Sequence, residues 1–234
     1  MYFGILNDYS QEFMSSLSPS ANSDRNSLNA RLDIDYLLQP QLSEQKDIQE
    51  VISGWHQTPK TIPPRYFYDA QGSRLFEAIC QLPEYYPTRT EAGILQQYAS
   101  TIIESTQANE LVQLGSGSAT KTRYLLDAYR NYTDEPLYYI PIDVSSSILQ
   151  ESAQQLLADY PQLKIRGKVA TYSQALAQLA TSSFGSRIIV FLGSSIGNFN
   201  PEECDRLLAE ITTALNSGDY FLLGIDLQKP VSIL

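Results

Sequence analysis

Hydrophobic and polar positions repeat regularly through the second half of the chain. Short apolar runs of strand type stand at residues 111–114, 137–142, 165–170, 187–192 and 219–225. The stretches between them carry hydrophobic residues at helical spacing and predict helices over 118–130, 147–159, 173–181 and 201–216. Helices of this length between short strands are typical of βαβ units. The pattern therefore predicts an α/β fold on a doubly wound, mainly parallel sheet, with five strands visible.

The first half of the chain lacks this alternation. Residues 1–30 are rich in Ser and Asn, which predicts a flexible extension with a short helix near residues 11–17. Residues 31–105 predict a mostly helical segment, whose last helix begins at Thr90, a suitable N-cap. We expect the α/β domain to occupy residues 106–234.

Two irregular loops that contain proline interrupt the helical segment. They carry Tyr66, Tyr68, Tyr85 and Tyr86. Because ligands of doubly wound sheets bind beyond the carboxyl ends of the strands, these loops are candidates to fold over that crevice. Tyrosine rings favour a nearby cation, although tyrosines are more often ordinary packing residues.

The composition argues against several classes of binding partner and site. The formal net charge is −10, which argues against nucleic acid or an anionic membrane surface as a partner. No apolar run approaches the roughly 18 residues of a membrane span. Two cysteines without close spacing and a single histidine predict neither a disulfide framework nor a metal site, and they favour a cytoplasmic setting.

A glycine-rich turn follows the first apolar run and leaves backbone N–H groups at a helix N-terminus. It begins at Gly115 and Gly117 and ends at Lys121, with Thr120 where a phosphate-binding loop or a dinucleotide fingerprint has a glycine. An S-adenosylmethionine turn needs no phosphate cradle and fits better, while an ordinary strand–helix turn stays possible. The methyl-donor interpretation also needs an acceptor for ribose hydroxyls, and Asp143, at the end of the next apolar run, is suited to that role. Its alternative role is to cap the following helix.

A second small-residue loop, after the 187–192 run, carries Asn198. Its amide offers an acceptor and two donors, which suit the ammonium or carboxylate group of an amino acid. The alternative is an ordinary turn residue after Gly197.

Four motifs, in this order, carry a resemblance to a known family: residues 64–77 (PRYFYDAQGSRLFE), 82–91 (LPEYYPTRTE), 114–122 (LGSGSATKT) and 191–199 (FLGSSIGNF). The chain resembles the histidine-specific methyltransferases of ergothioneine biosynthesis over residues 31 to 234. The resemblance implies a Rossmann-like class I methyltransferase that uses S-adenosyl-L-methionine to trimethylate the α-amino group of L-histidine, giving hercynine.

The resemblance also implies roles for particular residues. Substrate L-histidine would meet Tyr85 and Asn198, and Tyr68 would lie near the reacting amine, so Tyr68 and Asn198 are the catalytic candidates. The cofactor-binding candidates are Gly115, Gly117, Lys121, Asp143, Thr171 and Tyr172. The last two stand where the family usually has Asp-Phe, the acid of which contacts the adenine amino group.

The family continues beyond the position of Leu234, so the sequence is interpreted as a C-terminally truncated member. We expect a monomer with a small-molecule substrate. Two alternatives follow: an inactive or cofactor-binding-only remnant, and a methyltransferase of another amino acid, such as a tryptophan derivative.

Overall fold

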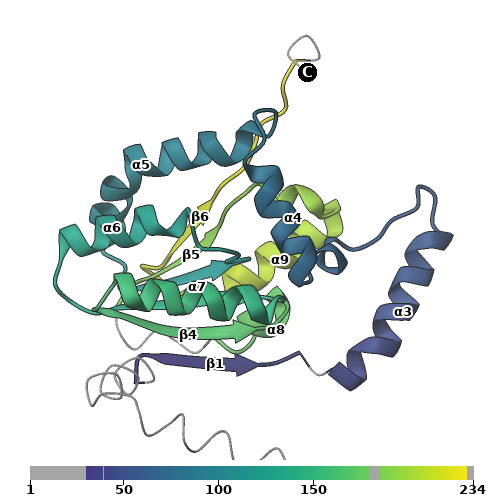
Figure 1. Cartoon of the computed structure of the whole chain (residues 1–234), viewed down its shortest axis with the longest axis horizontal. Helices are drawn as coiled ribbons and strands as arrows, with labels where there is room; N and C mark the ends of the chain where they lie inside the picture. The colour runs from purple at the N-terminus through teal and green to yellow at the C-terminus, as the bar shows by residue number, and fades with distance from the viewer. Residues whose placement is uncertain (1–29, 39, 180–184, 231–234) are drawn as a thin grey trace, which may run out of the picture.

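One parallel sheet organises the part of the chain that the structure, a computed structural model, describes: residues 30–38, 40–179 and 185–230. Its strand order is β1-β4-β3-β2-β5-β6, and every pair is parallel (Figure 1). The strands are β1 (Leu32–Tyr36), β2 (Glu110–Leu114), β3 (Leu137–Asp143), β4 (Leu163–Val169), β5 (Arg187–Phe191) and β6 (Tyr220–Leu223). The order of β4-β3-β2-β5-β6 is that of a doubly wound, Rossmann-like sheet.

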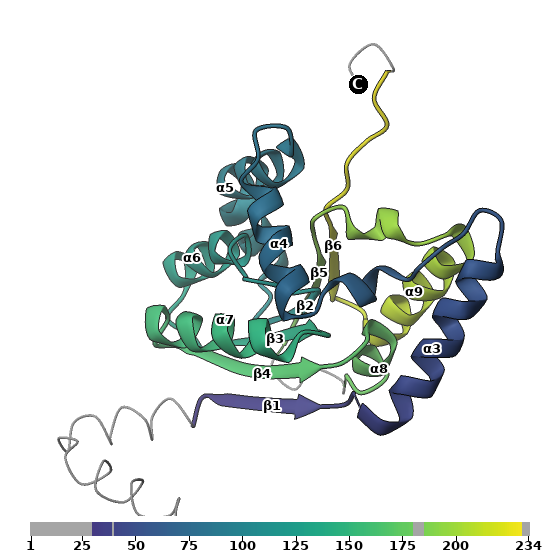
Figure 2. The ribbon, with the colours of Figure 1, turned by 45° about the vertical axis from the view of Figure 1, so that its right-hand side comes forward.

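Helices cover both faces of the sheet (Figures 1 and 2). On one face, α5 (Tyr86–Thr106), α6 (Thr122–Tyr132) and α7 (Ser146–Asp159) pack on alternate strand residues such as Leu111. On the other face, α8 (Tyr172–Leu176) and α9 (Pro201–Ala214) pack on the intervening residues, such as Val112. Successive strand side chains point to opposite faces, so the same apolar strands supply both cores.

The five strands predicted from the apolar runs are all present, which confirms the α/β prediction. The strand β1 was missed. It pairs with β4 at the edge of the sheet, where Asp35 lies opposite Lys168, and the two side chains form an ion pair of 2.7 Å. Its sequence, LDIDY, alternates apolar and acidic residues, which is the pattern of a half-buried strand.

The segment before β2 is helical after β1, as predicted. It comprises α3 (Pro40–His56), η1 (Pro64–Phe67), α4 (Ala70–Cys80) and α5. The prediction that Thr90 caps the last helix is wrong, because α5 begins at Tyr86 with Pro87 in its first turn. Proline is well tolerated there, since the first N–H groups of a helix have no partner within it.

Two other predictions concern the N-terminal extension and the helix after β4. The predicted extension, apart from residue 30, lies outside the described residues, and so does its short helix at 11–17. The helix predicted over 173–181 ends at Leu176 as α8. Among the described helices, none is long and apolar enough to span a membrane.

Candidate functional site

A cavity of about 990 Å³ opens at the carboxyl ends of the strands. The loops that follow β2, β3, β4, β5 and β6 form one side of it, and η1, α4 and α5 form the other. This is the position where doubly wound sheets bind their ligands. The two loops that were candidates to fold over the crevice therefore contribute residues to its lining.

The glycine turn lies at the base of this cavity. Gly115 and Gly117 have φ angles of +67° and +50°, a region that favours glycine. A Cβ added at Gly115 would lie 2.8 Å from the Tyr172 hydroxyl, so a side chain there would clash with Tyr172. Beside them, the Ser116 hydroxyl is buried without a hydrogen-bond partner among the described residues. A buried polar atom without a partner is costly, so this atom is suited to a bound polar ligand.

Asp143 ends β3 and bonds to the glycine turn. One carboxylate oxygen accepts a hydrogen bond from the Gly117 N–H at 2.9 Å, and the other accepts from the Ser145 N–H at 2.9 Å. The second bond matches the alternative role weighed for Asp143, at the start of the next helix. Burial raises the pKa of Asp143, and these backbone donors oppose the rise. The residue thus fixes the turn while it also lines the cavity.

Lys121 closes the glycine turn and lines the cavity, where its ammonium forms an ion pair with Glu91 of α5. The Glu91 side chain is 14% exposed. Its two oxygens also accept the Gly193 N–H, at 2.8 and 3.0 Å. The Lys121 charge therefore already has a partner within the chain.

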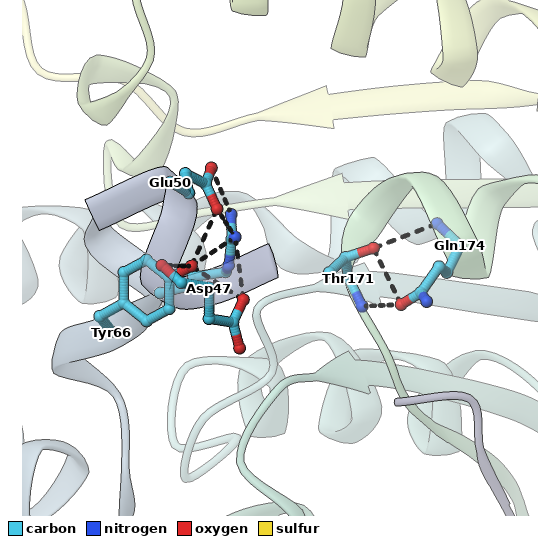
Figure 3. Close-up of polar contacts among 6 residues, drawn as sticks. Asp47, Glu50, Tyr66, Thr171 and Gln174 are labelled. Atoms are coloured by element: carbon cyan, nitrogen blue, oxygen red, sulfur yellow. Dashed lines mark hydrogen bonds and ion pairs between the residues drawn. The ribbon is translucent and has the colours of Figure 1, made fainter. Parts of the chain in front are cut away.

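Thr171 and Tyr172 follow β4 and line the same cavity. Thr171 is the N-cap of α8: its hydroxyl accepts from the Gln174 N–H at 3.3 Å and donates to the Gln174 side chain at 3.0 Å (Figure 3). The Tyr172 ring packs edge-on against Phe191, with centroids 5.4 Å apart, and its hydroxyl points toward Gly115. Burial raises the pKa of Tyr172, so it is a neutral phenol.

Tyr68 and Tyr85 face the cavity from the helical segment. Both rings pack edge-on against Phe76 of α4, at centroid distances of 5.8 and 6.1 Å. Burial raises the pKa of both hydroxyls, so both tyrosines stay protonated at neutral pH. They can donate or accept hydrogen bonds but are poorly suited to act as bases.

The other two loop tyrosines differ from this pair. The Tyr66 hydroxyl bonds to Asp47 and Glu50 of α3, at 2.8 Å each, and Arg65 joins the same cluster (Figure 3). Tyr66 does not line the cavity, although Arg65 and Tyr68 of the same loop do. Tyr86 lines the cavity and bonds to Asp226 after β6.

Asn198 ends η2 (Ser195–Asn198), the short helix after β5. Its side chain is exposed at the cavity wall, with no hydrogen bond to any other described residue. A free amide at this place can bind a polar ligand.

Eight of the nine predicted site residues line the one cavity: Tyr68, Tyr85, Gly115, Lys121, Asp143, Thr171, Tyr172 and Asn198. Gly117 does not line it and contributes through its bond to Asp143. The sequence analysis missed Glu91 and Ser116. Within the described residues, no cluster of three or more His, Cys, Asp or Glu side chains could hold a metal ion.

Comparisons with known proteins identify the family. The model of the family "Histidine-specific methyltransferase, SAM-dependent" matches residues 47–234. The chain belongs to this family. The fold class predicted from the sequence, a Rossmann-like class I methyltransferase, agrees with that membership and with the observed sheet.

Two curated relatives in mycobacteria are named histidine N-alpha-methyltransferase. The relative from Mycolicibacterium smegmatis is 42% identical over 77% of this chain and 56% of its own length. The relative from Mycobacterium tuberculosis is 39% identical over 80% of this chain and 57% of its own length. Ergothioneine biosynthesis protein 1 of Neurospora crassa is 32% identical over 72% of this chain and 19% of its own length. The chain thus spans little more than half the length of the two mycobacterial relatives.

Proposed function

We propose that this chain binds S-adenosyl-L-methionine and L-histidine for trimethylation of the histidine α-amino group to hercynine, a step of ergothioneine biosynthesis. The observation that carries the proposal is the shared cavity. The candidate residues at the ends of β2, β3, β4 and β5 and in the helical segment come from separate stretches of the sequence, and they line the same space in a chain of the histidine-specific family.

The residues on the sheet side fit a nucleoside that carries an amino acid. Asp143 supplies carboxylate oxygens for ribose hydroxyls, and Gly115, which has no side chain, lets the ligand approach the turn closely. The unpartnered Ser116 hydroxyl and the Lys121 ammonium lie in the same turn, near the place of the amino acid part. Thr171 and Tyr172 would border the base. When bound, the cofactor supplies an activated methyl group.

Asn198, in the loop after β5, and the tyrosines of the helical segment would hold the histidine. Asn198 has a free amide for the ammonium or carboxylate group, and Tyr85 and Tyr68 offer neutral hydroxyls from the other side of the cavity. Because raised pKa values keep both phenols protonated, they would orient the amine lone pair rather than remove a proton. The proton that the amine loses would then pass to solvent. Methyl transfer needs dry surroundings and alignment more than a strong base.

The test is a calorimetric titration of the 234-residue chain, first with S-adenosylhomocysteine and then with L-histidine. We expect saturable binding of both, with histidine binding only after the cofactor product fills the site. Incubation with S-adenosyl-L-methionine should give methylated histidine by mass spectrometry, and L-tryptophan is the competitor control.

The outcomes separate the alternatives. Cofactor binding without histidine binding would favour a cofactor-binding remnant. A preference for tryptophan would favour a methyltransferase of another amino acid. Absence of cofactor binding would refute the proposal.

A further inference from the structure

We infer that Glu91 is a positioning residue for cofactor binding: its carboxylate holds the ends of β2, β5 and β6 together, and so sets the places of Lys121 and of the loop that carries Asn198. The inference rests on the proposed function for its ligand. Glu91 is not among the residues that the family motifs assign to the cofactor or the substrate.

The contacts of Glu91 reach two strand ends from a third element. The residue belongs to the second turn of α5, in the helical segment. Its carboxylate pairs with the Lys121 ammonium in the turn after β2. Both of its oxygens accept the Gly193 N–H after β5, at 2.8 and 3.0 Å. Charged hydrogen bonds of this kind are the strong ones, so they fix the two loops relative to α5.

The contact of Glu91 with the third strand end, that of β6, is steric. A Cβ added at Gly224, directly after β6, would overlap the Glu91 carboxylate. Gly224 does not have a positive φ angle, so its backbone conformation alone does not require glycine. The backbone of Gly224 also bonds to the β5 end, with its N–H donating to the Phe191 carbonyl at 2.8 Å and its carbonyl accepting from the Ser194 N–H at 3.1 Å. A glycine at this position therefore makes room for the carboxylate.

The position of the carboxylate connects both halves of the site. Lys121 faces the proposed place of the cofactor's amino acid part, whereas the loop that starts at Gly193 leads to Asn198 on the histidine side. Tyr85 stands at the start of the helix that carries Glu91. One side chain thus relates cofactor and substrate residues to each other, and methyl transfer depends on such alignment.

A purely local role is the competing explanation. An acidic residue near a helix N-terminus also stabilises the helix through its dipole, and that role would affect stability alone. Binding and loop dynamics are therefore the measurements that distinguish a positioning residue from a helix-stabilising one.

The experiment compares Glu91→Gln with Glu104→Gln, a matched control. Glu104 lies on the same helix and is exposed, and its side chain has no hydrogen bond or ion pair with the described residues. We expect Glu91→Gln to bind S-adenosylhomocysteine about tenfold more weakly in calorimetry, and Glu104→Gln to bind as the wild type does. Thermal unfolding of each variant checks that it is folded. An affinity of Glu91→Gln within about twofold of the wild type would overturn the inference.

A second pair of variants tests the role of Gly224. Gly224→Ala should weaken cofactor binding by displacing the carboxylate, and Glu91→Ala should weaken it by removing the carboxylate. Because both changes act on the same contact, the double variant should bind the cofactor product no more weakly than the single variant with the lower affinity. If the loss of affinity in the double variant equals the product of the two single losses, the two changes do not share a mechanism.

Hydrogen–deuterium exchange of the cofactor-free protein tests the same idea without a ligand. Peptides that cover residues 193–199 should exchange faster in Glu91→Gln than in Glu104→Gln. Equal exchange would refute the inference even if the cofactor binds. If the wild type binds no cofactor, the proposed function fails, and this measurement still decides whether Glu91 holds the loop.

Discussion

Asp143 is the residue whose charge state governs the proposed cofactor site. Burial raises its pKa, so it takes up a proton at a higher pH than an ordinary aspartate does. Because the folded state binds this proton more tightly than the unfolded state, protonated Asp143 adds to the free energy of unfolding. This contribution is complete below the unfolded-state pKa and is lost as the pH rises through the folded-state pKa. The ionised carboxylate thus costs stability, while in the proposed site it supplies the acceptors that ribose hydroxyls need.

We therefore predict that cofactor-product affinity falls as Asp143 is protonated. Calorimetry with S-adenosylhomocysteine from about pH 8 to about pH 5 should show weakening that begins above the usual aspartate range. Asp143→Asn should bind about tenfold more weakly at neutral pH, with a flatter pH profile. Asp159→Asn, which alters an exposed surface pair, is the control and should behave as the wild type. If the wild-type affinity stays constant over this range and Asp143→Asn binds as tightly as the wild type, this carboxylate does not contact the ligand.

At the residue scale, the sequence predicts which side chains lie at the carboxyl edge of the sheet, but it does not predict which of them contact one another. Gly115 and Asp143 stand directly after apolar runs, Asn198 lies in the loop that follows another, and parallel strands bring such positions to one edge. Glu91 carries no comparable signal, because an acidic residue early in a helix has an ordinary local explanation. Its partners, Lys121 and Gly193, lie 30 and 102 residues away in the chain.

The helix α4 supports one wall of the cavity, and its N-cap is a testable element. Asp69 accepts the Gly72 N–H at 2.7 Å, which satisfies one of the free donors at the helix start. We predict that Asp69→Ala lowers the free energy of unfolding by about 1 kcal/mol in urea denaturation. Asp69→Ser, which retains an N-cap acceptor, should recover most of this loss. Equal losses in the two variants would mean that Asp69 acts through something other than the cap.

At the element scale, the buried strands were predictable and the edge strand was not. The β2 and β5 strands, ELVQL and RIIVF, are buried at every position, and most of their residues are apolar. The β1 strand has acidic residues at alternate positions, and its ion-pair partner Lys168 is 133 residues away. The start of α5 was misplaced for a different reason. The N-cap preference of threonine favoured Thr90, but the helix begins earlier, with Pro87 in its first turn.

At the scale of the whole molecule, the two ends of the sheet have different roles. The carboxyl ends of the strands form the cavity. At the amino ends, Arg187 and Glu110 begin two neighbouring strands and form an ion pair, with side chains only 2% and 5% exposed. Arg187 also donates to the Ala214 carbonyl at 2.9 Å. The pair therefore joins β2, β5 and the end of α9 far from the site residues.

We predict that Arg187→Met destabilises the protein without a direct effect on ligand binding. Removal of one partner leaves the Glu110 charge buried and uncompensated, which costs about 3–5 kcal/mol. Urea denaturation should show this loss, while the folded fraction keeps its affinity for S-adenosylhomocysteine. Arg130→Met breaks an exposed pair and should change stability by about 0.5 kcal/mol or less.

Because an apolar replacement of both charges removes the uncompensated one, the double variant Glu110→Leu/Arg187→Met should be more stable than Arg187→Met alone. If the double variant is less stable, the buried charge is not the cause of the loss, and packing around Arg187 is.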